Sequence, residues 1–113
     1  MEKLIIDRNI WLRGEGGFKS YLLRTSDKKK CCIGILVSSL LNIEDDKILG
    51  KSTAISDEWL VSLIPQEMKW LKNYPIMAEF YDTNDDPTIS DEEREKKLTV
   101  LFAAQNIKVE FIN

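Results

Sequence analysis

The spacing of apolar and polar residues predicts short strands at the two ends of the chain and helices between them. Residues 3–6 form a brief apolar run that is typical of a strand. Residues 107–111 alternate between apolar and charged side chains, which is the pattern of a half-buried strand. Residues 32–41 carry apolar side chains at helical intervals, so we expect a buried central helix there. Asn106 suits the left-handed position that ends a helix before the second strand.

The segment between the first strand and the central helix is rich in glycines and turn-forming residues. Asp7 can cap a short helical turn that continues through Leu12 and stops at Gly14. Residues 20–24 are expected to be extended, and residues 26–28 have the composition of a turn. The sequence therefore predicts an irregular, glycine-containing loop in this region.

Proline and serine mark where the later helices begin. Pro65 and Pro75 each suit the first turn of a helix, whereas residues 59–64 are apolar but too few to distinguish helix from strand. Ser90, followed three residues later by Glu93, predicts a capping box at the start of the last helix. We therefore expect an α+β fold, in which a small sheet including the paired terminal strands packs against the buried central helix and the C-terminal helix.

Length and composition limit the architecture. The 113 residues suffice for one hydrophobic core, so we expect a single domain over residues 1–113, with the polar stretch 44–58 forming a turn of helix and then a loop. No apolar run approaches the roughly 20 residues that a membrane helix needs. The start of the chain is too short and too quickly acidic for a secretory signal. We expect a protein of the cytoplasm that does not contact membranes.

The absence of histidine excludes many kinds of active site. With no histidine in the chain, no Ser-His-Asp triad, Cys-His dyad or histidine-based metal site can form.

Two other kinds of active site remain to be considered. The adjacent Cys31 and Cys32 cannot close a loop with a disulfide. To act as nucleophiles they would need the nearby lysines and the helix start to lower the pKa of a thiol, whereas free cysteine is more commonly buried in the core. Residues 95–97 have the Glu-x-Lys form of magnesium nucleases, but in a predicted helix instead of a strand. We expect no enzyme and no cofactor.

The charge is distributed unevenly along the chain. The net charge is −3, but residues 1–40 carry +4 and residues 41–113 carry −7. An acidic half repels a long polyanion, so duplex DNA is not an expected partner. A compact anion could still bind in a local basic pocket.

A candidate ligand site lies in the basic, glycine-containing segment. Glycines allow backbone N–H groups to approach an anion, arginine forks bind phosphate, and tryptophan stacks on a base. The predicted ligand-binding residues are Arg8, Trp11, Arg13, Gly14, Tyr21, Arg24 and Lys30. In the simpler interpretation, Trp11 belongs to the core, Arg13 is a surface charge and the glycines only turn the chain.

Residues 82–93 offer an alternative site, for a metal ion. They place oxygen-bearing side chains at the ligand positions of a calcium-binding EF-hand loop, among them Asp82, Asn84, Asp86 and Glu93. The loop normally has glycine at its sixth position, where this chain has Pro87, whose φ is restricted to negative values. The capping box of the last helix explains part of the same pattern.

Several short motifs carry a resemblance to a known group of proteins. They are an Asn84-Asp85 loop before the last helix, and the segments Trp11-Leu12-Arg13-Gly14, Ser20-Tyr21-Leu22-Leu23 and Cys31-Cys32-Ile33-Gly34. In these motifs the chain resembles small proteins encoded by bacteriophages and prophages, whose pattern is Trp-x-Arg-Gly, Ser-x-Leu-Leu and Cys-Cys-Leu-Gly. Ile33 replaces the usual leucine, and residues 28–30 replace a Gly-Lys-like turn. The resemblance implies a protein made in the host bacterial cytoplasm that binds and blocks a host component.

These observations together lead to a functional hypothesis. We expect a non-enzymatic counter-defence protein, a homo-oligomer, that sequesters a small anionic host molecule such as a nucleotide immune signal. A rival hypothesis is an inhibitor that blocks a host defence nuclease through its acidic surface. The same residues are also compatible with a calcium-binding helix-loop-helix protein and with an enzyme acting through carboxylates or Cys32.

Overall fold

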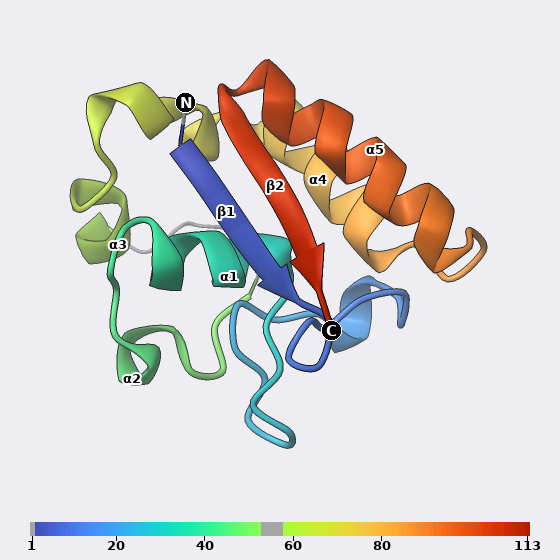
Figure 1. Ribbon diagram of the computed structural model, residues 1–113. Coiled ribbons are helices and arrows are strands. Elements are labelled where there is room, and N and C mark those ends of the chain that lie inside the picture. The colour runs from blue at the N-terminus through green and yellow to red at the C-terminus, as the bar shows by residue number, and fades with distance from the viewer. Residues whose placement is uncertain (1, 53–57) are drawn as a thin grey trace.

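The computed structural model describes residues 2–52 and 58–113 and has the predicted α+β architecture (Figure 1). The terminal strands, β1 (Glu2–Asp7) and β2 (Ile107–Ile112), lie side by side. They run parallel, in a register that places Leu4 beside Val109. Parallel neighbours require a crossover connection, and here this connection contains every helix that the described residues form.

The helices cover one face and one side of the two strands. The helix α1 lies behind the sheet, and α4 and α5 form a pair beside β2 (Figure 1). The bounds are α1 (Cys32–Ser39), α2 (Asp45–Ile48), α3 (Glu58–Ser62), α4 (Tyr74–Asp85) and α5 (Asp91–Ala104), with two 3-10 helices, η1 (Gly17–Lys19) and η2 (Gln66–Lys72). The predicted fold class is confirmed.

The core forms where the strands, α1 and the α4–α5 pair meet. Both strands alternate as predicted, with Leu4 and Ile107 buried and Lys3 and Lys108 exposed. In α1, all residues from Cys32 to Val37 are buried, which confirms the predicted central helix. Sheet and helices therefore share one hydrophobic cluster.

Gly34 lets α1 pack unusually close to the preceding segment. A Cβ atom at this position would overlap the backbone carbonyl of Leu22. Only a residue without a side chain allows this approach. The glycine in the Cys-Cys-x-Gly motif therefore has a packing role.

The local capping predictions are confirmed. Ser90 caps α5, its hydroxyl accepting a hydrogen bond from the N–H of Glu93 at 3.1 Å. Pro75 lies in the first turn of α4, and Asn106 has a φ of 62° before β2. These features depend on neighbours in the sequence, which is why the sequence predicts them well.

One local prediction needs correction, and two are made more specific. Residues 8–10 form a turn and not a capped helix through Leu12. Asp7 accepts hydrogen bonds from the N–H groups of Asn9 and Ile10, and the chain then runs beside Lys30. Residues 20–24, predicted to be extended, form isolated bridges at Tyr21 and Leu23.

The other refinement concerns the segment after the central helix. Pro65 precedes a helix, as predicted, and this helix, η2, is of the 3-10 type. Residues 59–64, which the sequence left open, contain most of the short helix α3. Within the stretch 44–58, the predicted turn of helix is α2, while residues 53–57 of the predicted loop lie outside the described residues.

Candidate functional site

Three of the predicted ligand residues meet where the two strands end. The N–H of Arg8 donates to the carbonyl of Ile112 at 2.9 Å, directly after β1. The guanidinium of Arg13 lies 4.6 Å from the ring centroid of Trp11 and donates to the carbonyl oxygens of Arg8 and Trp11 at 3.1 and 3.0 Å. Arg8, Trp11 and Arg13 are thus brought together, at the carboxyl end of parallel strands.

Most of their charges and polar atoms are nevertheless already bound within the chain; the exception is the Nε of Arg13, which is buried without a hydrogen-bond partner. Arg8 forms a bidentate pair with Glu95, with both distances at 2.8 Å, and the Nε of Arg13 lies 3.5 Å from a carboxylate oxygen of Asp91. Trp11 is 1% exposed, which leaves its ring no face for stacking on a ligand. The simpler interpretation, in which Trp11 is a core residue, describes this side chain.

The remaining predicted cations are held by other carboxylates. Arg24 binds both Glu15 and Asp27, and this arginine lowers the pKa of Asp27 to about 2. Lys30 lies 2.9 Å from Asp45 and donates to the hydroxyl of Ser38.

The other two predicted ligand residues are also used inside the fold. Tyr21 accepts a hydrogen bond from the N–H of Cys31 through its own backbone carbonyl. Gly14 has a positive φ of 70°, and its N–H donates to the carbonyl of Asn84 at 2.9 Å. The seven residues therefore do not point into one common pocket.

The two cysteines are core residues. Cys31 and Cys32 are each 1% exposed, and Cys31 accepts a hydrogen bond from the N–H of Gly34 as the cap of α1. Burial is the main cause that raises the pKa of Cys31 to about 12 and that of Cys32 well above its ordinary value. Both thiols stay protonated at neutral pH, which does not suit a nucleophile.

The calcium alternative does not fit the geometry. Asp82 and Asn84 lie in the last turn of α4, which continues to Asp85, and not in a loop. Asn84 is buried, and its side-chain oxygen accepts hydrogen bonds from the indole of Trp11 at 2.8 Å and from the N–H of Cys32 at 3.1 Å. Among residues 2–52 and 58–113, no three His, Cys, Asp or Glu side chains are placed to hold a metal ion.

A buried polar centre, which consists of Asn84 and Arg94, joins the glycine loop to the α4–α5 turn. Arg94 is 2% exposed and donates to the carbonyl oxygens at the end of α4 and in the turn, which are those of Thr83, Asn84, Asp86 and Ile89. It thereby satisfies acceptors that a helix leaves unpaired at its C-terminus. The sequence does contain a signal for this burial, since Arg94 precedes the core residues Leu98 and Phe102 by four and eight positions.

Beside this centre lies a cavity that we call the acidic hollow. It measures about 450 Å³ and is lined by Gly16, Gly17, Tyr81, Asp82, Asp85, Asp86 and Pro87. Asp85 is only 9% exposed, and burial raises its pKa although a hydrogen bond from Asn84 partly opposes this effect. A hydrogen bond from Thr88 lowers the pKa of Asp86, so this carboxylate is ionised at neutral pH.

A fully exposed aromatic side chain lies next to the acidic hollow. Phe18 belongs to η1 and directly follows Gly17, which lines the cavity. An exposed phenylalanine contributes nothing to the core, and aromatic residues are enriched where proteins bind one another. Phe18 is absent from the sequence-based predictions because nothing in its local pattern distinguishes it from a core residue.

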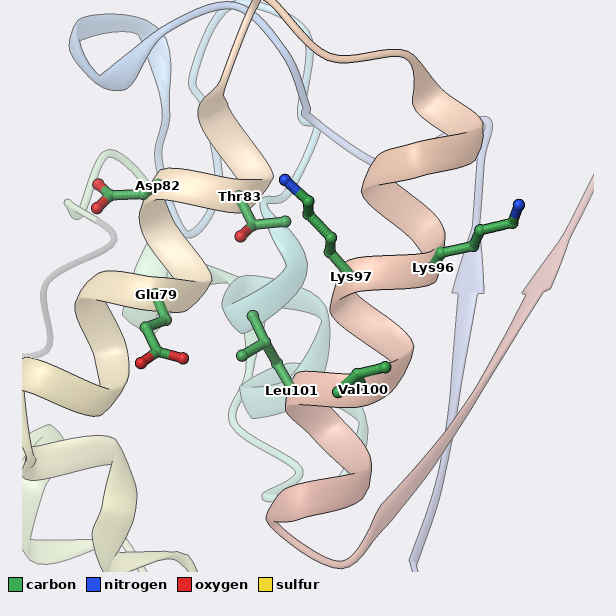
Figure 2. Close-up of a pocket in the computed structure, with 7 residues that line it drawn as sticks. All are labelled: Glu79, Asp82, Thr83, Lys96, Lys97, Val100 and Leu101. Carbon is green, nitrogen blue, oxygen red and sulfur yellow. The ribbon is translucent and has the colours of Figure 1, made fainter.

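A second hollow runs between the last two helices, and we call it the α4–α5 groove. It measures about 540 Å³ and is lined by Glu79, Asp82, Thr83, Lys96, Lys97, Val100 and Leu101. Figure 2 shows Lys97 and Leu101 directed between the helices, whereas Asp82 and Lys96 point to opposite sides of the pair. Val100 is 69% exposed on this surface.

The chain matches no family model, no curated protein and no solved structure. In the part of the chain that the structure describes, no helix is both long enough and apolar enough to span a membrane. The geometry of the two hollows and of the charged residues around them is therefore the basis for proposing a function.

Proposed function

We propose that the protein is an inhibitor that acts by binding, and that the acidic hollow receives basic side chains of a nucleic-acid-binding protein. The observation that carries this proposal is the placement of Asp82, Asp85 and Asp86 on one cavity beside the exposed Phe18. Carboxylates held close together take the place of phosphates on a surface that normally binds nucleic acid. Given the resemblance to phage proteins, we propose a host defence nuclease as the partner.

The acidic hollow is prepared for a cation from a partner. Asp82 and Asp86 form no salt bridge with any residue in 2–52 or 58–113, although Arg94 and Lys97 lie near enough to favour the charged form of Asp86. The third carboxylate, Asp85, has already lost most of its hydration through burial. A lysine or arginine side chain that enters the cavity gains a strong electrostatic interaction at a small additional desolvation cost.

Glycine and phenylalanine add features that suit a protein partner. Gly16 and Gly17 expose backbone at the rim of the cavity, where a side chain of a partner can approach closely. Phe18 offers a rigid apolar contact next to the charged cavity. This combination of a central aromatic and surrounding charges is common in protein–protein interfaces.

The test is inhibition of purified bacterial defence nucleases by the purified chain. We expect one of them to be inhibited stoichiometrically, and the double variant Asp82→Asn/Asp86→Asn to inhibit it at least tenfold more weakly, because each ion pair lost at an interface is costly. Phe18→Ala is expected to act in the same direction. The matched control is Glu67→Gln, which neutralises an exposed carboxylate outside the acidic hollow.

Two results would contradict the proposal. One is that none of the nucleases is inhibited by the wild-type chain. The other is that inhibition occurs but is unchanged in the Asp82→Asn/Asp86→Asn variant, which would place the interface elsewhere. Circular dichroism of each variant shows that the fold is retained.

Sequestration of a small anion is the second candidate, and one observation favours it. Arg8 and Arg13 do converge at the carboxyl end of the strands, and the carboxylate of Asp91 beside Arg13 is 57% exposed at a distance of 3.5 Å. A phosphate group could displace this weakly held carboxylate. If it does, the nucleotide raises the melting temperature more in Asp91→Asn than in wild type, and not at all in Arg13→Ala. The candidate is rejected if no nucleotide in a panel changes the melting temperature of the wild-type protein.

A further inference from the structure

We propose that two copies of the chain form a two-fold dimer through the α4–α5 groove, so that α4 of each copy packs against α5 of the other. The groove has an acidic wall, formed by Glu79 and Asp82 of α4, and a basic wall, formed by Lys96 and Lys97 of α5. The outer surface of the helix pair therefore contains both halves of a complementary charge pattern. This interface differs from the acidic hollow, although Asp82 lines both cavities; Asp85 and Asp86 line only the acidic hollow, and Glu79 lines only the groove.

The charges of the groove are only weakly used within one copy. Glu79 and Asp82 form no salt bridge with any residue that the structure describes. Lys96 and Lys97 lie 3.5 and 3.7 Å from glutamates one turn earlier in α5, in exposed pairs. Such pairs contribute little to stability and are readily exchanged for better ones.

An apolar strip continues the basic wall along α5, one turn beyond Lys96 and Lys97. Val100 is 69% exposed and Leu101 is half-buried, and Ala104 continues the same side of α5 one turn later. This strip is distinct from the core stripe of α5, which consists of Leu98 and Phe102. Burial of this valine by a second copy would favour dimerisation, because apolar surface is removed from water.

The symmetry of the charges selects one orientation of the dimer. The two helices are connected by a short turn and run antiparallel; Asp82 lies near the level of Lys97, and Glu79 lies further along α4, beside Leu101 (Figure 2). A two-fold axis parallel to the helices places the acidic wall of each copy against the basic wall of the other. An axis across the helices would instead place like charges together, which is unfavourable.

The directions of the side chains agree with this orientation. Asp82 and Lys96 point to opposite sides of the helix pair in one copy (Figure 2). Rotation about an axis parallel to the helices exchanges these sides, so Asp82 of one copy comes to the same rim as Lys96 of the other. The four helices then form an antiparallel bundle, a common arrangement for dimers of helix hairpins.

Sedimentation equilibrium of the full chain tests the proposal with two charge-reversed variants. We expect wild-type protein to be dimeric, and Glu79→Lys/Asp82→Lys and Lys96→Glu/Lys97→Glu each to dimerise at least tenfold more weakly, because each variant has a groove of a single sign. An equimolar mixture of the two variants is expected to recover a dimer, which native mass spectrometry identifies as a heterodimer. Lys108→Glu on the exposed face of β2 is the control and leaves the dimer unchanged.

The mixing experiment distinguishes a lost interface from a damaged fold. A variant that simply failed to fold would not form a heterodimer with the other variant. Wild-type protein that stays monomeric at about 100 μM would overturn the proposal, since an interface of ordinary size gives a measurable dimer there. Dimerisation that persists unchanged in both variants, or a mixture that stays monomeric, would overturn it as well.

Discussion

The cations of the first 30 residues and the single arginine of α5 differ in what binds them. Arg8, Arg24 and Lys30 lie near the surface and are held by carboxylates. Arg94 is buried and is held chiefly by backbone carbonyl oxygens at the end of α4. The first group carries the charge excess that is visible in the sequence, whereas the second has a structural role that the distribution of charge along the chain does not reveal.

This difference teaches that a local excess of charge does not identify a binding site. A cationic side chain of the first 30 residues that already pairs with a carboxylate of the same chain is not free to bind a ligand. Asp82 and Asp86 of the acidic hollow and Glu79 of the α4–α5 groove form no salt bridge among the described residues, so they are the better candidates for interfaces. Four predictions test the contrast, in order of decreasing effect.

Loss of Arg94 is expected to have the largest effect. Arg94→Met leaves several buried carbonyl oxygens without a donor, so the free energy of unfolding should fall by about 3–5 kcal/mol. Urea denaturation followed by circular dichroism measures this change. Lys108→Met on the exposed face of β2 is the control, with a change within about 0.5 kcal/mol; equal effects of the two variants would disprove the role of the polar centre.

Replacement of Gly14 is expected to have an intermediate effect. Its φ of 70° disfavours side chains, and a Cβ atom would lie 2.9 Å from Nη2 of Arg94. Gly14→Ala should therefore cost about 1–2 kcal/mol in unfolding experiments. Gly17→Ala is the matched control, because a Cβ atom there meets nothing within 4 Å; a cost at Gly17 as large as that at Gly14 would argue against this explanation.

Loss of Arg24 is expected to have a small effect that depends on pH. Arg24→Gln should cost less than about 1 kcal/mol at pH 7, since pairs near the surface contribute little. The folded state lowers the pKa of Asp27 from 3.8 to about 2, so this contribution is present above pH 3.8 and is lost as the pH falls towards 2. The difference in unfolding free energy between wild type and variant should shrink over that range, and a difference that grows in acid would contradict the pairing.

Chemical modification of the cysteines is expected to have no effect in the folded protein. Both thiols are buried beside the polar centre, and burial raises the pKa of each. A thiol reagent such as Ellman's should react with neither cysteine in native protein at pH 8 and with both after unfolding in urea. Stoichiometric labelling of folded protein would show that the α1 cap opens readily.

Several elements of the fold could be predicted from the sequence because their signals are local. The alternation in residues 107–111, the helical spacing after Cys32 and the cap at Ser90 each involve residues a few positions apart. These signals predicted both terminal strands, α1 and α5. The turn after β1 was assigned wrongly, since Asp7 suits a turn as well as the cap of an α-helix.

The candidate site could be predicted only in part. The sequence suggested that Arg8, Trp11 and Arg13 lie together, which is correct, but not that Glu95 and Asp91 of α5 lie beside them. These partners are about 80 positions away in the chain, and a single sequence does not show which distant charges meet. Phe18 and the acidic hollow escaped notice for the same reason.

The sequence by itself determined an α+β chain with paired terminal strands, a buried central helix, a capped last helix and no histidine-based chemistry. Hydrophobic period, capping residues and composition are properties of neighbouring residues, and they act before the chain is compact. Only the tertiary structure decided which charges neutralise one another, that Arg94 is buried, and which carboxylates remain available. Those outcomes depend on desolvation and on contacts between distant segments, which exist only once the helices have packed against the two strands.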